Sequence, residues 1–285
     1  MPRLPIFVAL AAALLPASAA ADIVGTCHFD TRTLSFEGTP SEQATCLLQH
    51  VGPFGKLEQR PLPPVFARLL AEPGWPSAAQ RDAAIADFDE PYRDYAKRME
   101  NWPASRTETD KPLAYFVIHD TSTPFYGDAP FPADIDHNPH VNSFAPYESG
   151  GLAADPVAHF FNNRLGQVWA GHDVATGWRA TKLESRVVGT AARGRFVHVE
   201  NVQPRRYAPG GSTREQTVGP AEGLSEAQYR TLAAIYVYTS WRAGRWLIPA
   251  FHATVDGGIA HAHDDPQNFD MKTFTAALEL LLAAK

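Results

Sequence analysis

Cysteine is scarce in this sequence of 285 residues, which contains only Cys27 and Cys46. Two cysteines with that spacing do not make a zinc knuckle. A basic excess is also absent, because 25 Lys and Arg stand against 31 Asp and Glu, for a net charge of −6. Nucleic acid is therefore not expected to be a partner, because phosphate binding needs clustered Lys and Arg.

Long apolar runs are missing too, apart from one at the N-terminus. Residues 6–15 form an apolar run that follows Arg3 and is too short to span a bilayer. Small residues over 17–21 offer cleavage sites, so residues 1–21 are predicted to be a secretory signal peptide, with a buried N-terminal helix as the alternative. We therefore expect an exported monomer without a membrane span, located in the periplasm or outside the cell.

The two cysteines are expected to form one disulfide in such an exported chain, closing a short loop near the mature N-terminus. Two separate thiols are the alternative. A lipid anchor on Cys27 is disfavoured, because Thr26 occupies the position where lipoprotein signals have Gly, Ala or Ser.

Strand-like and helix-like segments are mixed along the rest of the chain, which predicts an α/β fold with a central sheet flanked by helices. Residues 22–110 are interpreted as an N-terminal extension, irregular over 22–75 and helical over 77–102 with a break at Pro91. Strands are predicted over 113–119, 195–202 and 246–251, with a hairpin over 157–171 that turns near Gly166. Helices are predicted over 224–244, where Ser225 and Gln228 can form a capping box, and over 271–285. Residues 120–155 are predicted to form a loop that is unusually long for a compact domain, and loops of this length more often have a function than serve only as connections.

Two histidines stand at the ends of apolar strands, His119 after the first and His252 after the last. His252 opens the segment 252–265, which holds three histidines and three aspartates and ends with Asp265, followed by the stiffening Pro266. Imidazole and carboxylate groups bind zinc, and three such ligands with a fourth position open to water make a hydrolytic site. The pattern therefore favours a zinc hydrolase.

The order of the segments resembles the zinc-dependent N-acetylmuramoyl-L-alanine amidases of the type-2 family, which includes the peptidoglycan-recognition proteins. The match covers roughly residues 110–285 in several ordered stretches, so chance is a poor explanation. The stretches are IHDT at 118–121, AHFFNNRLGQV at 158–168, VHVEN at 197–201, LSEAQYRTLAAI at 224–235, FHA at 251–253 and DDPQNFD at 264–270.

The resemblance implies that residues 111–285 form a catalytic domain that hydrolyses the amide between the lactyl group of N-acetylmuramic acid and L-alanine of the peptidoglycan stem peptide. It implies zinc ligands at His119, His252 and Asp265, with Asp264 or His263 as alternatives for the last one. Glu200 would be the general acid and base.

Departures from the family pattern affect the remaining roles. The stretch from His252 to Asp265 is longer than usual, and His263 replaces a lysine, so oxyanion stabilisation would fall to His263. His198 replaces a glycine before Glu200. A Trp-His pair is replaced by Trp178 and Arg179, which are expected to bind substrate.

Other ionisable residues have no assigned part in the expected reaction. His159 is predicted to be a hydrogen-bonded structural histidine. His172, His198 and His261 are expected to take no part in catalysis, with a position behind the metal ligands as the alternative for His261. His137 and His140 are expected in a solvated loop, with a surface metal site as the alternative. Arg205 and Arg206 are expected to be a solvated pair, with contact to substrate carboxylates as the alternative. The alternatives to the amidase are a peptidoglycan-binding module of the same fold that does not cleave, and an amidase acting on another small acyl-amino-acid amide.

Overall fold

The centre of the molecule is a five-stranded mixed sheet within the described residues, 22–148 and 156–285 of this computed structural model. The predicted signal peptide and residues 149–155 of the predicted long loop lie outside the described residues. In spatial order the strands are β12 (Ile248–Phe251), β6 (Tyr115–Asp120), β9 (Phe196–Asn201), β7 (Phe160–Asn162) and β8 (Val168–Ala170). The first four are parallel, and β8 returns antiparallel to β7.

The middle strands are buried along their whole length, which explains the continuous apolar run in the first four residues of β6. Every residue of β6 and β9 is buried, and Phe116, Val117 and Ile118 have no exposed surface. Parallel strands covered on both faces read as continuous apolar runs rather than as alternating ones. The mixed α/β class predicted from the sequence is confirmed.

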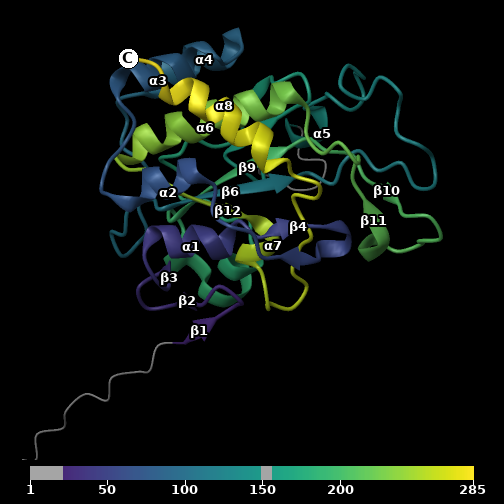
Figure 1. Cartoon of the computed structure of the whole chain (residues 1–285), viewed down its shortest axis with the longest axis horizontal. Helices are drawn as coiled ribbons and strands as arrows, with labels where there is room; N and C mark the ends of the chain where they lie inside the picture. Colours follow the sequence, from purple (N-terminus) through teal and green to yellow (C-terminus); the bar gives the residue numbers. More distant parts are fainter. Residues whose placement is uncertain (1–21, 149–155) are drawn as a thin grey trace, which may run out of the picture.

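Helices cover both faces of the sheet. Figure 1 shows α6 and α8 on one side, next to α3 and α4, and shows α1 on the other side. The helices are α1 (Pro40–Leu47), α2 (Pro64–Ala71), α3 (Ala78–Ala86), α4 (Glu90–Met99), α5 (Ala145–Glu148), α6 (Glu226–Ala243), α7 (His252–Val255) and α8 (Met271–Leu282), with the 3₁₀ turns η1 (Pro53–Gly55), η3 (Gly189–Ala192) and η4 (Arg214–Gln216) and the π-helix η2 (Leu183–Val188).

The longest helix, α6, begins as the sequence predicts. The Ser225 hydroxyl accepts a hydrogen bond from the amide of Gln228, whose side chain accepts from the amide of Ser225, so the expected capping box is formed. The side-chain amide of Gln228 also donates to the carbonyls of Asn162 and Val202, which ties the helix to the sheet. The predicted hairpin is present as β7 and β8, and its turn contains Gly166 at φ 76°.

The N-terminal residues are more regular than predicted. Residues 22–75 contain α1 and α2 and the short strands β1 (Ile23–Val24), β2 (Phe29–Asp30), β3 (Ser35–Phe36), β4 (His50–Val51) and β5 (Leu57–Glu58). The helical segment predicted over 77–102 is broken into two helices near Pro91, as expected. Pro91 lies in the first turn of α4, where its missing amide costs nothing. Capping residues and prolines, rather than long periodic runs, mark these short elements.

The N-terminal segment is attached to the loops that follow β12. Cys27 and Cys46 form the predicted disulfide, which rules out both separate thiols and a lipid anchor on Cys27. The hydroxyl of Thr254 donates to the carbonyl of Leu47 at 2.6 Å. The amide of Thr26 donates to the carbonyl of Gly257 at 2.7 Å. The residues that flank the disulfide therefore contact α7 and the turn that follows it.

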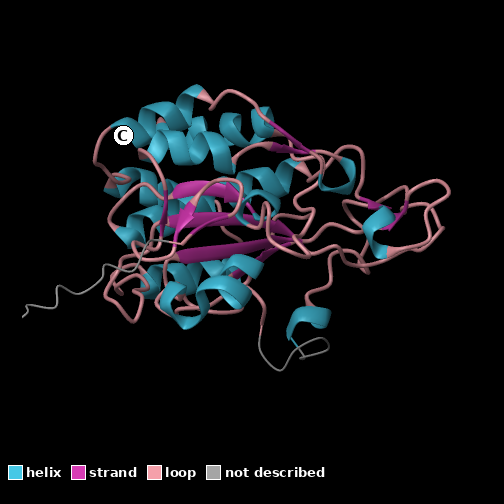
Figure 2. Cartoon of the chain, turned by 90° about the horizontal axis from the view of Figure 1, so that it is seen from below, coloured by secondary structure: helices cyan, strands magenta, loops and turns pink. Residues whose placement is uncertain are grey.

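A loop-rich lobe projects to one side of the sheet, as Figure 2 shows. It carries the short strands β10 (Arg206–Tyr207) and β11 (Thr217–Val218). The bridge from Phe125 to Arg205 joins it to the loop after β6. The long loop predicted over 120–155 thus starts beside this lobe and contains the single short helix α5 within its described part.

Candidate metal centre

Three neighbouring parallel strands deliver ionisable side chains to one edge of the sheet. His119 is the penultimate residue of β6, and Glu200 lies beside it in register on β9. His252 directly follows Phe251, the last residue of β12, which is itself paired with Ile118. Because the carboxyl ends of parallel strands meet at one edge, residues far apart in the chain are brought together there, as in other open α/β sheets.

Asp265 completes a buried group with the two histidines. Nδ1 of His119 lies 2.9 Å from Nδ1 of His252, which lies 3.2 Å from Oδ2 of Asp265. Oδ2 of Asp265 lies 3.7 Å from Nδ1 of His119. Its position is fixed by the backbone, because Oδ2 accepts from the amide of Asp120 and the carbonyl accepts from the amide of Ala253.

The spacing of these atoms suits a metal ion. Ligand atoms about 2.0–2.2 Å from a tetrahedral zinc ion lie roughly 3.3 Å from one another. The three distances in the group bracket that value, and all three side chains are almost fully buried. His119, His252 and Asp265 can therefore hold a metal ion.

The charges within the group favour a cation. Burial, followed by the charge of His252, holds the pKa of His119 well below its usual value, so its ring is neutral. Burial would also lower the pKa of His252, but Asp265 and Asp256 outweigh it and raise that pKa well above the usual value. Burial would raise the pKa of Asp265, yet His252 holds it well below. The carboxylates of Asp265 and Asp256 thus place negative charge around the two imidazoles, which favours a bound cation.

Glu200 lies next to the group with an unused oxygen. Oε1 lies 3.8 Å from Nδ1 of His119, and Oε2 is buried without a hydrogen-bond partner among the described residues. Burial and then the charge of Asp265 raise the pKa of Glu200 well above its usual value. A buried oxygen without a partner is costly unless a bound molecule uses it. The carboxyl group is thus suited to exchanging a proton with a water or substrate beside the metal position.

The alternative ligands named from the sequence, Asp264 and His263, lie near the buried group of three but are not part of it. Oδ2 of Asp264 accepts from the side-chain amide of Gln267 at 2.6 Å and lies 3.5 Å from the guanidinium of Arg205. His263 lies at the rim, where its side chain is 40% exposed and its Nδ1 is 3.6 Å from Oδ1 of Asp265. It remains close enough to face a molecule bound at the metal position.

Arg205 was expected to be solvated with Arg206, and this expectation is wrong. Its side chain is 1% exposed, and its guanidinium contacts both carboxylate oxygens of Asp120. The same carboxylate accepts from the amide of Gln267. A buried guanidinium is stable only when it is paired and hydrogen-bonded in this way. Arg205 thereby connects the loop after β6 with the loop that carries Asp265.

His198 was assigned no role, but it contacts a member of the group. Its Nδ1 lies 3.1 Å from Nε2 of His119. The two-residue periodicity of β9 contains the signal, because His198 and Glu200 are two positions apart and so share one face of the strand. On the other histidine of the group, Nε2 of His252 lies 2.9 Å from Oδ2 of Asp256.

His159 has the structural role predicted for it. Its Nδ1 accepts from the amide of His198, and its Nε2 therefore carries the proton and donates to the carbonyl of Thr176. Burial lowers the pKa of His159 to about 3.

The expected substrate residues Trp178 and Arg179 lie on the connection between β8 and η2. The ring of Trp178 is partly buried and stacks on His172, with the ring centroids 4.2 Å apart. Arg179 is exposed. The remaining histidines for which no role was expected, His137, His140 and His261, are also exposed.

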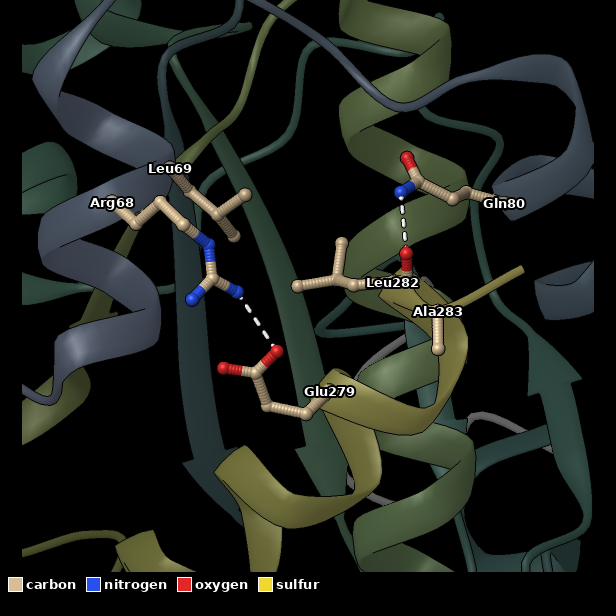
Figure 3. Close-up of a pocket in the computed structure, with 6 residues that line it drawn as sticks. All are labelled: Arg68, Leu69, Gln80, Glu279, Leu282 and Ala283. Atoms are coloured by element: carbon tan, nitrogen blue, oxygen red, sulfur yellow. Dashed lines mark hydrogen bonds and ion pairs between the residues drawn. The ribbon is translucent and has the colours of Figure 1, made fainter. Parts of the chain in front are cut away.

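A separate hollow lies between α2, α3 and α8, as Figure 3 shows. Arg68 and Glu279 form an ion pair across it, and the side chain of Gln80 donates to the carbonyl of Leu282. None of its lining residues belongs to the buried group at the strand ends.

Comparison with protein-family models, with curated proteins and with solved structures gave no match. Among the described residues, no helix combines the length and the apolar character needed to cross a membrane.

Proposed function

We propose that the protein is a zinc-dependent amidase that cleaves peptidoglycan between the lactyl group of N-acetylmuramic acid and the L-alanine of the stem peptide, on a type-2 amidase-like fold. The observation that carries the proposal is the meeting of His119, His252 and Asp265 at the carboxyl edge of the sheet, with Glu200 beside them. The residues that the family resemblance assigns to metal binding and catalysis are the ones that lie together.

The donor set supports zinc as the metal. Two imidazole nitrogens and one carboxylate oxygen leave one position of a tetrahedral ion open, as in hydrolytic zinc sites. A zinc ion bound there supplies Lewis acidity, which makes water a nucleophile near neutral pH.

The chain's own side chains supply the proton transfers. The free oxygen of Glu200 takes the proton from the attacking water, and the same carboxyl group then delivers it to the departing amine of L-alanine. The raised pKa of Glu200 suits a group that must hold a proton between these two steps. His263, at the exposed rim, is placed to donate to the oxyanion, and Trp178 and Arg179 are proposed to contact the glycan or peptide.

The disulfide supports export. Cys27 and Cys46 are bridged, and such bridges persist in oxidising compartments. A periplasmic or extracellular location would also give the enzyme access to its proposed substrate.

Digestion of purified sacculi tests the function directly. The zinc-loaded protein should release free stem peptides that begin with L-alanine, identified by mass spectrometry, and a chelator should abolish the release until zinc is restored. Binding to sacculi without release of peptide would show a binding module instead. Cleavage of small acyl-amino-acid amides, but not of defined muropeptides, would show an amidase with another substrate.

A further inference from the structure

A line of buried contacts leads from the metal centre into the protein. Nε2 of His119 lies 3.1 Å from Nδ1 of His198. On the far side of that ring, Nε2 of His198 lies 3.1 Å from Oε2 of Glu184. The side chains of His198 and Glu184 are 0% exposed, and that of His119 is 1% exposed.

The direction of the hydrogen bond between His119 and His198 is fixed by the metal centre. Nδ1 of His119 faces His252 and Asp265, so Nε2 must carry the ring proton when Nδ1 binds a cation. Nδ1 of His198 then accepts a hydrogen bond from that N–H, so the ring proton of His198 lies on Nε2, which faces Glu184. Each nitrogen has a single role, as in the carboxylate–histidine–metal arrangements that fix ligand tautomers.

Ordinary core packing does not account for these two side chains. Burying an imidazole and a carboxylate is costly, and an apolar pair would fill the same space without that cost. Moreover, Oε1 of Glu184 has no hydrogen-bond partner among the described residues, and neither has Nε2 of His198, whose approach to Glu184 has the distance but not the angle of a hydrogen bond. The contact of His198 with the metal ligand His119 explains why these polar side chains are buried here.

The carboxylate of Glu184 is held in place by one turn of the chain, residues 180–184, which we call the support turn. Oε2 accepts from the amides of Ala180 and Thr181 and from the hydroxyl of Thr181. The amides of Lys182 and Leu183 in the same turn donate to the carboxylate of Asp256.

Asp256 in turn contacts the second imidazole of the metal centre. Its Oδ2 lies 2.9 Å from Nε2 of His252. The support turn therefore fixes one carboxylate behind each imidazole, directly behind His252 and through His198 behind His119.

We propose that His198 is a positioning residue of the metal centre, which together with Glu184 and the support turn orients His119 and fixes its tautomer. This inference rests on the proposed function for the presence of the metal. It adds to that function the residues that hold a ligand in place, including a histidine at a position where the related family pattern has glycine.

Zinc affinity and cobalt spectroscopy test the role without any substrate. Replacing a partner of this kind typically weakens metal binding by about 10–100-fold. His198→Phe keeps the ring but removes the acceptor, so its zinc affinity, measured by competition with a chelating indicator, should fall by about that factor. The visible absorption bands of the Co²⁺-substituted protein should shift as well, because the orientation of a ligand changes.

Two further variants separate positioning from packing. In His198→Asn the side-chain oxygen occupies the position of Nδ1 and can accept from His119, so most of the affinity and the original Co²⁺ spectrum should return. His159→Phe is the matched control, because the His159 ring is equally buried, stacks on His198 at 5.6 Å and contacts none of the three ligands. It should leave both readouts unchanged. If His198→Phe does not fold, the Asn variant and Glu184→Gln, which should bind zinc more weakly, carry the test.

The outcomes distinguish this inference from the proposed function. Wild-type zinc affinity in His198→Phe, or equal losses in His198→Phe and His159→Phe without rescue by Asn, overturns the positioning role. Tight zinc binding by the wild type without cleavage of sacculi overturns the amidase proposal alone. A wild-type protein that binds neither zinc nor cobalt overturns both.

Discussion

Replacing Glu200 by Gln is the change that most sharply separates chemistry from metal binding. The carboxyl group lies beside the metal position but outside the group of three ligands, and its Oε2 has no partner. Gln has the same shape and keeps one acceptor oxygen, so the ligands should stay in place. It cannot take up a proton, so the general acid–base contribution of about 10²–10⁴-fold should be lost. That loss corresponds to roughly 2.7–5.4 kcal/mol of transition-state stabilisation.

The assay has two readouts on one preparation. Metal content, measured by elemental analysis after dialysis, should equal that of the wild type, while the release of stem peptide from sacculi under saturating zinc should fall by at least about a hundredfold. Turnover within a few-fold of the wild type would remove Glu200 from the chemistry. A large loss of zinc would instead make Glu200 a ligand and would refute the arrangement argued above.

Three further changes test other parts of the structure. Replacing Cys27 and Cys46 by alanine, which opens a loop closed across 19 positions, should lower the free energy of unfolding by about 3 kcal/mol in urea titrations, and an unchanged midpoint would contradict a constraining role. Asp265→Asn should lose zinc whereas Asp264→Asn should retain it, and the reverse result would reassign the last ligand. His159→Gln should reduce the loss of folding stability that the wild type shows as the pH falls. Burial lowers the pKa of His159 to about 3, so below about pH 6.5 the unfolded chain binds a proton that the folded chain refuses, and the wild type loses stability as the pH falls. Urea midpoints at pH 7 and pH 4 should therefore differ less in the variant, and equal differences would be inconsistent with a neutral buried ring.

Much of the sheet and of the candidate metal site could be predicted because the signals are local. The apolar run before His119 predicts a buried strand, the capping box at Ser225 predicts where α6 begins, and a histidine at a strand end predicts a side chain at the functional edge. These inferences need only periodicity, capping and the rule that parallel strands end at one edge.

The partners behind the ligands could not be predicted in the same way. Glu184 lies in η2, a segment whose sequence has no clear hydrophobic periodicity. Its contact with His198 depends on how the connection that follows β8 packs against β9. The sequence around Arg205 gives no sign that its side chain is buried, because its partner Asp120 is 85 positions away. Burial of a charged side chain is decided by such a long-range partner, which a single sequence does not reveal.

The interleaved order of the strands has a consequence for assembly of the site. His119 and His252 are 133 positions apart, and the contact from Asp120 to Asp265 spans 145. The group runs from His119 to Asp265, so every stretch of chain that holds all three residues includes 119–265, and β6 must pair with β12 for His119 and His252 to meet. Pairing of β9 with β6 places Glu200 beside His119. A polypeptide that ends before Asp265 lacks a member of the group, so binding of a metal ion would distinguish the folded, completed chain from its shorter fragments.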